Sequence, residues 1–435
     1  MSDLSSVRYA VLQPLTGGAY IGCEEAVGHP AEFIISYPGF ADPVYNKEGK
    51  IVDAGNEYHL IEYLKKHNRM VPYYTFNRKP FDEISDMSDV KLMKEGVEVD
   101  NPNYSGIDLV VAVPVCSGLS LATLGASSET LEKKNRNMIF LAKYALNVIK
   151  PKVYIFENAP KLSGNSGSHV RKILEEVALE SGYDVAFYRT DTRLHDNCQR
   201  RPRTFVYFFK KDNAHPGIPL IGFESKQVTI EEFLNRIPKN ATHNEPISIS
   251  EGNKSMLDYI KVVYGDNWRS KATATALVVE FLQQGKLDDW CKWVSEQEDI
   301  SDKTKKGVKK YVDHIHYKES LGKGFFVFSP TVAKNGVMPS AMYKTIPCTL
   351  HYKEDRLYTV REWLSAMGMP YDFEMAGDPN RFFARIGQNV PARTMQFIAS
   401  EAIRIIKNWD TVERNTEFPV ILFDNIKQTV SKIDA

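Results

Sequence analysis

The chain has 435 residues, enough for two or three domains with a sizeable core. Its 55 Lys and Arg residues balance its 55 Asp and Glu residues, so no global positive field indicates nucleic-acid binding and such a site would need local clustering. With 25% charged residues, no apolar run long enough to cross a bilayer and no signal-peptide pattern, we expect a soluble cytoplasmic protein.

In the first half, segments with strand patterning alternate with segments of helical spacing. The expected strands are residues 7–15, 31–37, 70–76, 107–115, 152–159, 184–190 and 203–211. One helix is expected to begin near residue 24, and three more are expected at residues 56–68, 131–150 and 169–182. This alternation predicts an α/β domain with a mostly parallel sheet, which binds ligands in loops at the carboxyl ends of its strands.

The regular pattern breaks after residue 211 and returns with expected helices at residues 359–368 and 391–409. The region between mixes short helices and loops and contains a lysine cluster. Its members are Lys303, Lys305, Lys306, Lys309 and Lys310. A lysine run is usually a solvated helix face, and contact with phosphates is the alternative. We therefore divide the chain into residues 1–211, an inserted smaller domain at 212–349, and residues 350–435.

One of five scattered cysteines follows a buried strand. Their spacing argues against a disulfide framework and a zinc site, so we expect no metal. Cys116 lies two positions after Pro114, at the start of a loop with small residues. These are Ser117, Gly118 and Ser120. A cysteine at a strand end often only packs, but a thiol in such a loop can be a nucleophile.

Charged groups stand at two further strand ends. Glu157 and Asn158 end the strand at 152–159. Glu157 is expected to be a helix cap, the partner of an arginine, or a carboxyl with a raised pKa that holds a proton at neutral pH. Arg201 and Arg203 alternate on an extended segment, so we expect both on one face, as surface groups or as a fork for a carbonyl or phosphate.

The order of these features is more specific than any one of them. A Gly17-Gly18 turn, then P-x-C-x-G-x-S, E-N-x-P and Q-x-R-x-R, each at a strand end, resemble the C5-cytosine-specific DNA methyltransferases. "RLYTVREWLSAMGMPYDF" (356–373) resembles the family's R-x-L-T-x-R-E block, and "RIGQNVPARTMQFIASEAIRI" (385–405) its last block and helix. The resemblance covers about residues 7–210 and 350–410. It implies a Rossmann-like S-adenosylmethionine-dependent methyltransferase fold with a smaller mixed α/β target-recognition domain inserted at 212–349.

The resemblance also implies a reaction. The chain would act, without a metal and as a monomer, on double-stranded DNA in a prokaryotic or phage-infected cell, in restriction–modification or phage DNA modification. Cys116 would attack C6 of a flipped-out cytosine, with Glu157 at N3 and Arg203 at O2, and S-adenosyl-L-methionine would give the methyl group to C5. Arg201 and Asn158 would shape the site, and Gln199 would join Ser117, Gly118 and Ser120 in contacting the substrate. The implied cofactor residues are Gly17, Gly18, Leu15, Tyr37, Asn77, Pro114, Asn389 and Val390.

The cofactor motifs depart from the family. Gln13 and Leu15 stand where the first block has an aromatic residue and a glycine, and the Leu15 side chain would take up space near the ligand. No acidic residue ends the second strand to hold the ribose, since only Ser36 and Tyr37 are there. Asn77 replaces an expected Asp, His195-Asp196 replaces Tyr-Gly, and G-Q-N-V replaces G-N-S-V.

These departures leave three alternatives open. They are the same chemistry on an RNA such as tRNA, a relative that uses another one-carbon donor, and a catalytically silent DNA-binding homologue. The length of 212–349 favours DNA over RNA.

Overall fold

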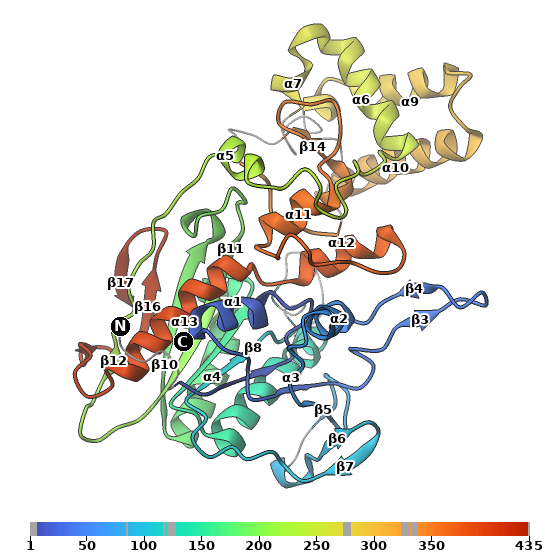
Figure 1. Cartoon of the computed structure of the whole chain (residues 1–435). Helices are drawn as coiled ribbons and strands as arrows, with labels where there is room; N and C mark the ends of the chain where they lie inside the picture. Colours follow the sequence, from blue (N-terminus) through green and yellow to red (C-terminus); the bar gives the residue numbers. More distant parts are fainter. Residues whose placement is uncertain are drawn as a thin grey trace.

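An eleven-stranded sheet forms the centre of the molecule in the computed structural model (Figure 1). The structure describes residues 7–83, 86–115, 119, 128–272, 280–322, 331–332, 337–343 and 345–433. The strand order is β17-β16-β10-β11-β9-β8-β1-β2-β5-β6-β7. These strands span Tyr9–Leu12 (β1), Ile34–Ser36 (β2), Tyr73–Phe76 (β5), Leu92–Lys94 (β6), Val97–Val99 (β7), Leu109–Ala112 (β8), Val153–Asn158 (β9), Tyr183–Asp191 (β10), Pro202–Lys210 (β11), Val420–Asp424 (β16) and Thr429–Lys432 (β17).

The middle of the sheet is parallel. Strands β9, β8, β1, β2 and β5 pair in parallel, whereas β11 is antiparallel to both of its neighbours, β9 and β10. All seven strands expected from the sequence are present, and the mostly parallel α/β fold is confirmed. The carboxyl ends of the parallel strands and the start of β11 therefore lie along one edge.

Helices cover both faces of this sheet. On one face lie α1 (Gly18–Val27), α2 (Tyr58–Lys66) and α13 (Ala392–Lys407), and on the other α3 (Ser128–Tyr144) and α4 (Ser168–Ser181). Side chains of a strand alternate between the faces, so in β1 Tyr9 and Val11 join the first core, and Ala10 and Leu12 join the second. The result is a three-layer arrangement with two hydrophobic cores.

A group of helices with its own core stands above the sheet in Figure 1, and we call it the helical unit. It consists of α6 (Glu251–Tyr264), α7 (Trp268–Lys271), α9 (Lys286–Glu296) and α10 (Asp302–Ser320). Two-residue strands, β13 (Thr331–Val332) and β14 (Thr349–Leu350), pair beside it. The chain reaches it through α5 (Ile230–Asn235) and returns through α11 (Val360–Ala366) and α12 (Pro379–Gln388).

The structure adds elements that the sequence patterns did not predict. A hairpin of β3 (Val44–Tyr45) and β4 (Ile51–Asp53) is inserted between β2 and α2. Other additions are β6, β7, β16, β17, α12 and the short pair β12 (Ile218–Pro219) with β15 (Arg414–Asn415). The expected helix near residue 24 in fact begins at Gly18, directly after the turn. Short 3-10 turns span Met87–Asp89, Pro160–Ser163, Asn165–Gly167, Thr192–Leu194, Gly265–Asn267 and Ile346–Cys348, and a π-helical segment spans Ala145–Ile149.

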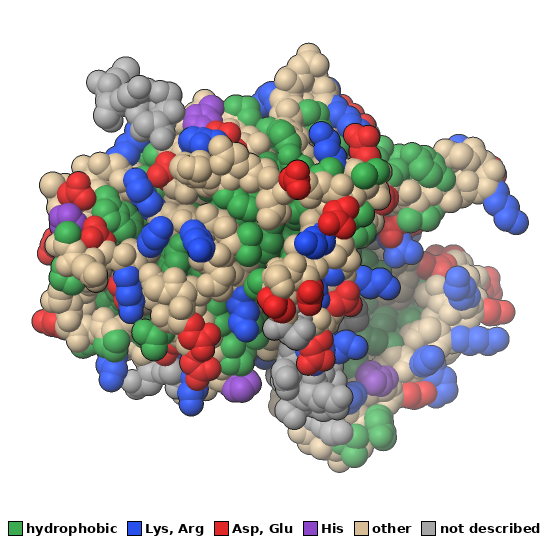
Figure 2. Space-filling view, turned by 90° about the horizontal axis from the view of Figure 1, so that it is seen from below, with side chains coloured by type: hydrophobic (Ala, Val, Ile, Leu, Met, Phe, Trp, Pro, Cys, Tyr) green, Lys and Arg blue, Asp and Glu red, His purple; other side chains and the backbone are tan. Residues whose placement is uncertain are grey.

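The surface agrees with the balanced charge of the chain. Figure 2 shows Lys and Arg side chains interspersed with Asp and Glu side chains on the face it presents. Within the residue ranges that the structure describes, no helix is long and apolar enough to span a bilayer.

Candidate active site

The loop expected to carry the nucleophile begins at the shared edge of the sheet. Ala112 of β8 pairs with Phe156 of β9, so the segment after β8 lies beside Glu157. Pro114 is buried at this point. Cys116, Ser117, Gly118 and Ser120 fall outside the described residues. Their roles therefore stay predictions.

A buried asparagine fixes the start of this loop. The Val115 backbone N–H donates to Asn137 Oδ1 at 2.7 Å, and Asn137 Nδ2 donates to the Tyr37 hydroxyl at 2.8 Å. Both side chains are fully buried, and burial raises the pKa of Tyr37. Asn137 thus ties the loop to the end of β2. The motifs did not include this residue, although a polar residue between the apolar positions of the helix at 131–150 was a usable signal.

Glu157 and Arg203 form an ion pair at the same edge. Arg203 Nε donates to Glu157 Oε1 at 2.5 Å, and the two side chains are 16% and 7% exposed, with the arginine the more open. The antiparallel register places Phe205 opposite Glu157, which brings the preceding arginine to the carboxyl. The two residues expected to contact the base are therefore together. Asn158 is next to them but faces inward, with its amide nitrogen 3.4 Å from Met138 Sδ.

Arg201 does not form the expected fork with Arg203. Its guanidinium is buried and donates to Ala341 O at 2.7 Å, Gly387 O at 2.8 Å and Asn389 O at 3.0 Å. Backbone carbonyls from two distant segments surround Arg201. Gln199 is likewise fully buried, with its amide nitrogen 3.4 Å from Ala366 O. Both residues hold neighbouring segments of the described chain together, and their predicted roles toward the substrate stay predictions.

The glycine turn meets the last motif of the chain. Gly17 has a φ of +112°, which L residues rarely adopt, and the Gly18 N–H donates to Asn389 Oδ1 at 2.9 Å. A Cβ on Gly18 would lie 1.9 Å from Val390 O, so only glycine fits. Four of the expected cofactor residues, distant in sequence, therefore lie side by side.

Leu15 has a backbone conformation that favours glycine. Its φ is +53°, in the left-handed region. The side chain is buried in the same core as Leu60, and its predicted effect on the space near the ligand stays a prediction. Asp196 behaves in the same way at the second replaced glycine, with a φ of +53° and ion pairs to Lys226 and Arg236.

A carboxyl group does lie at the end of β2, contrary to the sequence expectation. Glu57 is fully buried, and it accepts hydrogen bonds from the Ser36 hydroxyl at 2.6 Å and the Tyr73 hydroxyl at 2.8 Å. Burial raises the pKa of Glu57 to about 7, against the opposing hydrogen bonds from Ser36, Tyr73 and the Leu15 backbone. The β3–β4 hairpin separates Glu57 from β2 in the sequence, so no local pattern could place it there.

Gln13 is the second polar group at this turn. It follows β1, is fully buried, and has no hydrogen-bond partner among the described residues at either Oε1 or Nε2. A buried amide left without partners is unusual in a folded protein and points to a ligand or water at this position. Asn77, by contrast, is exposed, and its side chain bonds to the backbone of Asp89 and Lys91.

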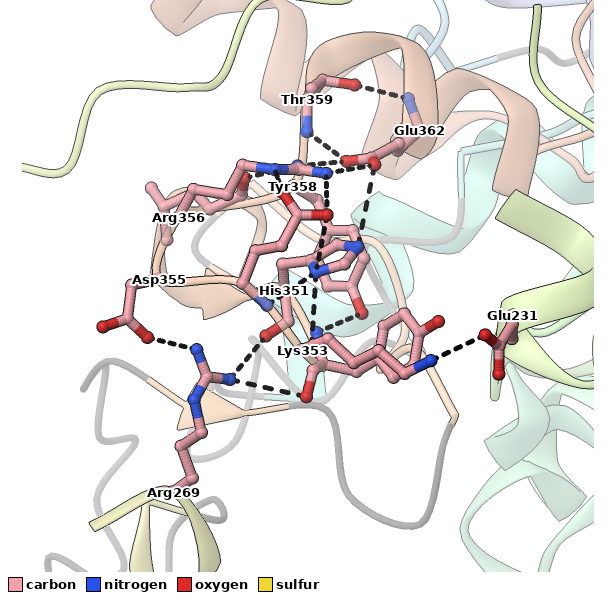
Figure 3. A network of polar contacts seen from close by, with 12 residues as sticks. Glu231, Arg269, His351, Lys353, Asp355, Arg356, Tyr358, Thr359 and Glu362 are labelled. Atoms are coloured by element: carbon pink, nitrogen blue, oxygen red, sulfur yellow. Dashed lines mark hydrogen bonds and ion pairs between the residues drawn. The ribbon is translucent and has the colours of Figure 1, made fainter. Parts of the chain in front are cut away.

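The R-x-L-T-x-R-E block has a structural role in the described chain (Figure 3). Arg356 binds Glu362 through two hydrogen bonds of 2.8 Å, and Thr359 and Glu362 cap the N-terminus of α11 reciprocally. Arg361 is buried and donates to the backbone oxygens of Thr242 and Pro370. The block thus fastens the returning chain to the segment that leads out to the helical unit.

One group of possible metal ligands occurs among the described residues. Asp212, His215 and Asp410 have donor atoms within 4.8 Å of one another. Asp212 and His215 follow the carboxyl end of β11, at the opposite end of this strand from Arg203, and Asp410 follows α13. They are therefore not part of the candidate active site.

Comparison with known proteins gives a consistent result. Residues 58–404 match the family model described as C-5 cytosine-specific DNA methylase. Type II methyltransferase M1.HphI of Haemophilus parahaemolyticus is 23% identical over 313 residues, which are 70% of this chain and 71% of the relative. DNA (cytosine-5)-methyltransferase 3 of Arabidopsis thaliana is 21% identical over 324 residues, 66% of this chain but 22% of the relative.

A solved structure supports the fold. The methyltransferase EhMeth of Entamoeba histolytica superposes with a TM-score of 0.51 at 11% sequence identity, covering 92% of this chain and 98% of that one. At this identity the likeness concerns the fold alone.

The two arginines of the Q-x-R-x-R segment give a first prediction. Arg201→Met removes the donor of three carbonyl groups, two of them in buried hydrogen bonds, those of Ala341 and Asn389. A buried group left unsatisfied costs about 1–3 kcal/mol, so the free energy of unfolding falls by more than about 2 kcal/mol. Arg203→Met removes the ion-pair partner of Glu157 at the edge of the sheet. This change lowers the free energy of unfolding less than Arg201→Met does, while methyltransferase activity is lost. Denaturant unfolding of both variants tests this, and equal losses of stability would contradict the separation of roles.

Proposed function

Because this chain belongs to the C-5 cytosine-specific DNA methylase family, we propose that it transfers a methyl group to C5 of cytosine in double-stranded DNA. The observation that carries the proposal is the Glu157–Arg203 pair at the edge where β8 leads to Cys116. The protein would act as a monomer in the cytoplasm of a prokaryotic or phage-infected cell. Residues 1–211 and 350–435 would form the catalytic domain, and residues 212–349 would recognise the target.

The proposed chemistry requires a nucleophile and stabilisation of charge on the ring. C5 of cytosine is a poor nucleophile, and addition of the Cys116 thiolate to C6 makes it reactive. The electrons of the ring double bond then shift toward N3 and O2. The bound cytosine would separate Glu157 from Arg203. Glu157 would then hold a proton at N3 of the ring, and Arg203 would donate a hydrogen bond to O2. Loss of the C5 proton later releases the thiolate.

The residues at the glycine turn fit a nucleoside-type donor. S-adenosylmethionine supplies an electrophilic methyl group when bound. Gly17 and Gly18 form a tight turn after β1, Glu57 offers a carboxylate to the ribose hydroxyls, and Gln13 offers an amide that the described residues leave unpaired. Leu15 preserves the turn despite its side chain. These features favour the usual donor over another one-carbon donor or an eroded pocket.

Covalent trapping tests the nucleophile. DNA that carries 5-fluorocytosine should form a stable adduct in the presence of S-adenosylmethionine, because fluorine cannot leave as the C5 proton does. Cys116→Ser should abolish the adduct, while Cys291→Ser, at a half-buried cysteine of the helical unit, should keep it. Gel analysis with duplex DNA and with tRNA decides the acceptor. A full adduct in Cys116→Ser would refute the assignment, and an adduct with tRNA alone would favour an RNA substrate.

The carboxyl is tested by an isosteric change. Glu157→Gln keeps the shape but cannot hold the N3 proton, so we expect kcat to fall by roughly 10²–10⁴-fold. The free energy of unfolding should change little, since the amide oxygen of the variant can still accept the hydrogen bond from Arg203 Nε. Single-turnover methylation and denaturant unfolding measure the two quantities. A variant that unfolds but keeps its specific activity would mark Glu157 as a purely structural group.

Donor binding should depend on pH through Glu57. With a pKa of about 7, Glu57 is mostly protonated below neutral pH, and its ionised fraction falls about tenfold from pH 8 to pH 6. Titration calorimetry should therefore show weaker S-adenosylmethionine binding at pH 6. Glu57→Gln should bind about 10–100-fold more weakly at pH 8 and lose this pH dependence, because a charged hydrogen bond contributes about 1.5–3 kcal/mol.

The exposed Glu48, in the turn of the β3–β4 hairpin, provides the control, since Glu48→Gln should match the unaltered protein. Binding by Glu57→Gln equal to this control would exclude Glu57 from the donor site. No binding of S-adenosylmethionine or of its demethylated product to the unaltered protein would favour the silent homologue or another donor.

A further inference from the structure

Helix α10 presents three different faces along its 19 residues. Val308, Val312 and Ile315 are buried and join the core of the helical unit. A second face lies toward α9, where His316 Nε2 is 3.1 Å from Asp288 Oδ1. On an exposed flank of the helix, Lys309 forms an ion pair with Asp313 at 3.3 Å. The lysine cluster recognised in the sequence is therefore divided between different environments.

The third face is an exposed stripe with three lysines, which we call the α10 stripe. It consists of Lys303, Lys306, Lys310, His314 and Tyr317. Their spacing of three, four, four and three residues places them on one side of the helix, opposite the buried face. All five are exposed, and Tyr317 is 60% exposed.

The charges of the stripe are not neutralised within the described part of the chain. None of Lys303, Lys306 and Lys310 has an acidic group of a described residue within 4.0 Å, whereas Lys309, on the neighbouring face, has one. A capped helix holds the row in place, because the Ser301 hydroxyl accepts from the Thr304 N–H and also contacts Glu251 of α6. The stripe is thus a rigid row of cations that no described carboxylate pairs.

We propose that the α10 stripe binds the phosphate backbone of the DNA substrate; this inference rests on the function proposed above and adds the surface that holds the duplex. From Lys303 to Tyr317 the stripe is about 21 Å long at 1.5 Å per residue. One DNA strand presents about six charges over that length. The His314 ring and the Tyr317 hydroxyl can donate hydrogen bonds to further phosphate oxygens.

The shape of the stripe favours a regular polyanion over a lipid surface. A helix that lies on a membrane exposes a broad apolar face beside its cations, but the apolar face of α10 is buried in the core of the helical unit. The stripe itself offers cations at regular steps along a straight axis, which matches the repeating charge of a duplex.

Salt dependence of binding tests the proposal. Fluorescence anisotropy with duplex DNA gives the slope of log Kobs against log salt, whose magnitude is about 0.9 for each phosphate that a basic side chain neutralises. The triple variant Lys303→Gln, Lys306→Gln and Lys310→Gln should therefore reduce the slope by about two to three units. It should methylate the same cytosine as before, because phosphate contacts carry no sequence information.

A matched control lies on the same helix. Lys305→Gln, Lys309→Gln and Lys318→Gln remove the same charge from the other faces, where the three side chains are half-buried or paired, and should reduce the slope by less than one unit. An unchanged slope in the stripe variant, or an equal reduction in both triples, would overturn the proposal while leaving the methylation function intact. Weakened binding of tRNA but not of duplex DNA would also overturn it. If the unaltered protein neither binds nor methylates DNA, both proposals fail.

Discussion

Four strands, β9, β8, β1 and β2, are hydrogen-bonded side by side in the same direction, and this shared direction determines where each polar group of the site lies. Each strand delivers one group to the same edge: Glu157, the segment to Val115, Gln13 and Ser36. The antiparallel β11 adds Arg203 because it starts where its neighbour β9 ends. A slip of one residue would turn these side chains to the opposite face, so the register of the sheet also fixes the chemistry.

Two residues that stand in place of glycines of the family pattern have a left-handed backbone. Leu15 and Asp196 replace glycines and still adopt φ values of +53°. A left-handed residue other than glycine costs about 1 kcal/mol or more, and it persists only where its surroundings hold it. Burial in the core does so for Leu15, and ion pairs with Lys226 and Arg236 do so for Asp196. A side chain at either position is therefore compatible with a backbone that favours glycine.

The sequence predicted the elements with strong periodicity and the edge where the site lies, but not contacts made across long separations. Alternation placed Arg201 and Arg203 on one face, yet only the fold shows that carbonyls of residues 341 and 387 enclose Arg201. Glu57 was not predicted as a site residue because the β3–β4 hairpin separates it from Ser36 in the sequence, although the two side chains are hydrogen-bonded in the fold. Strands β16 and β17 were missed because short C-terminal strands pair with an edge already formed, which no local pattern encodes.

The polar groups on the two sides of the site are mechanically connected. Tyr37 directly follows β2, and Val115 leads toward Cys116. Asn137 is hydrogen-bonded to both Tyr37 and Val115. Breaking either bond would leave a buried group unsatisfied, at a cost of about 1–3 kcal/mol. The end of β2 and the start of the loop are therefore held by the same buried side chain. Because one side chain holds both segments, loss of Asn137 would remove a support from the donor side of the site and from the segment that leads to the expected nucleophile at the same time.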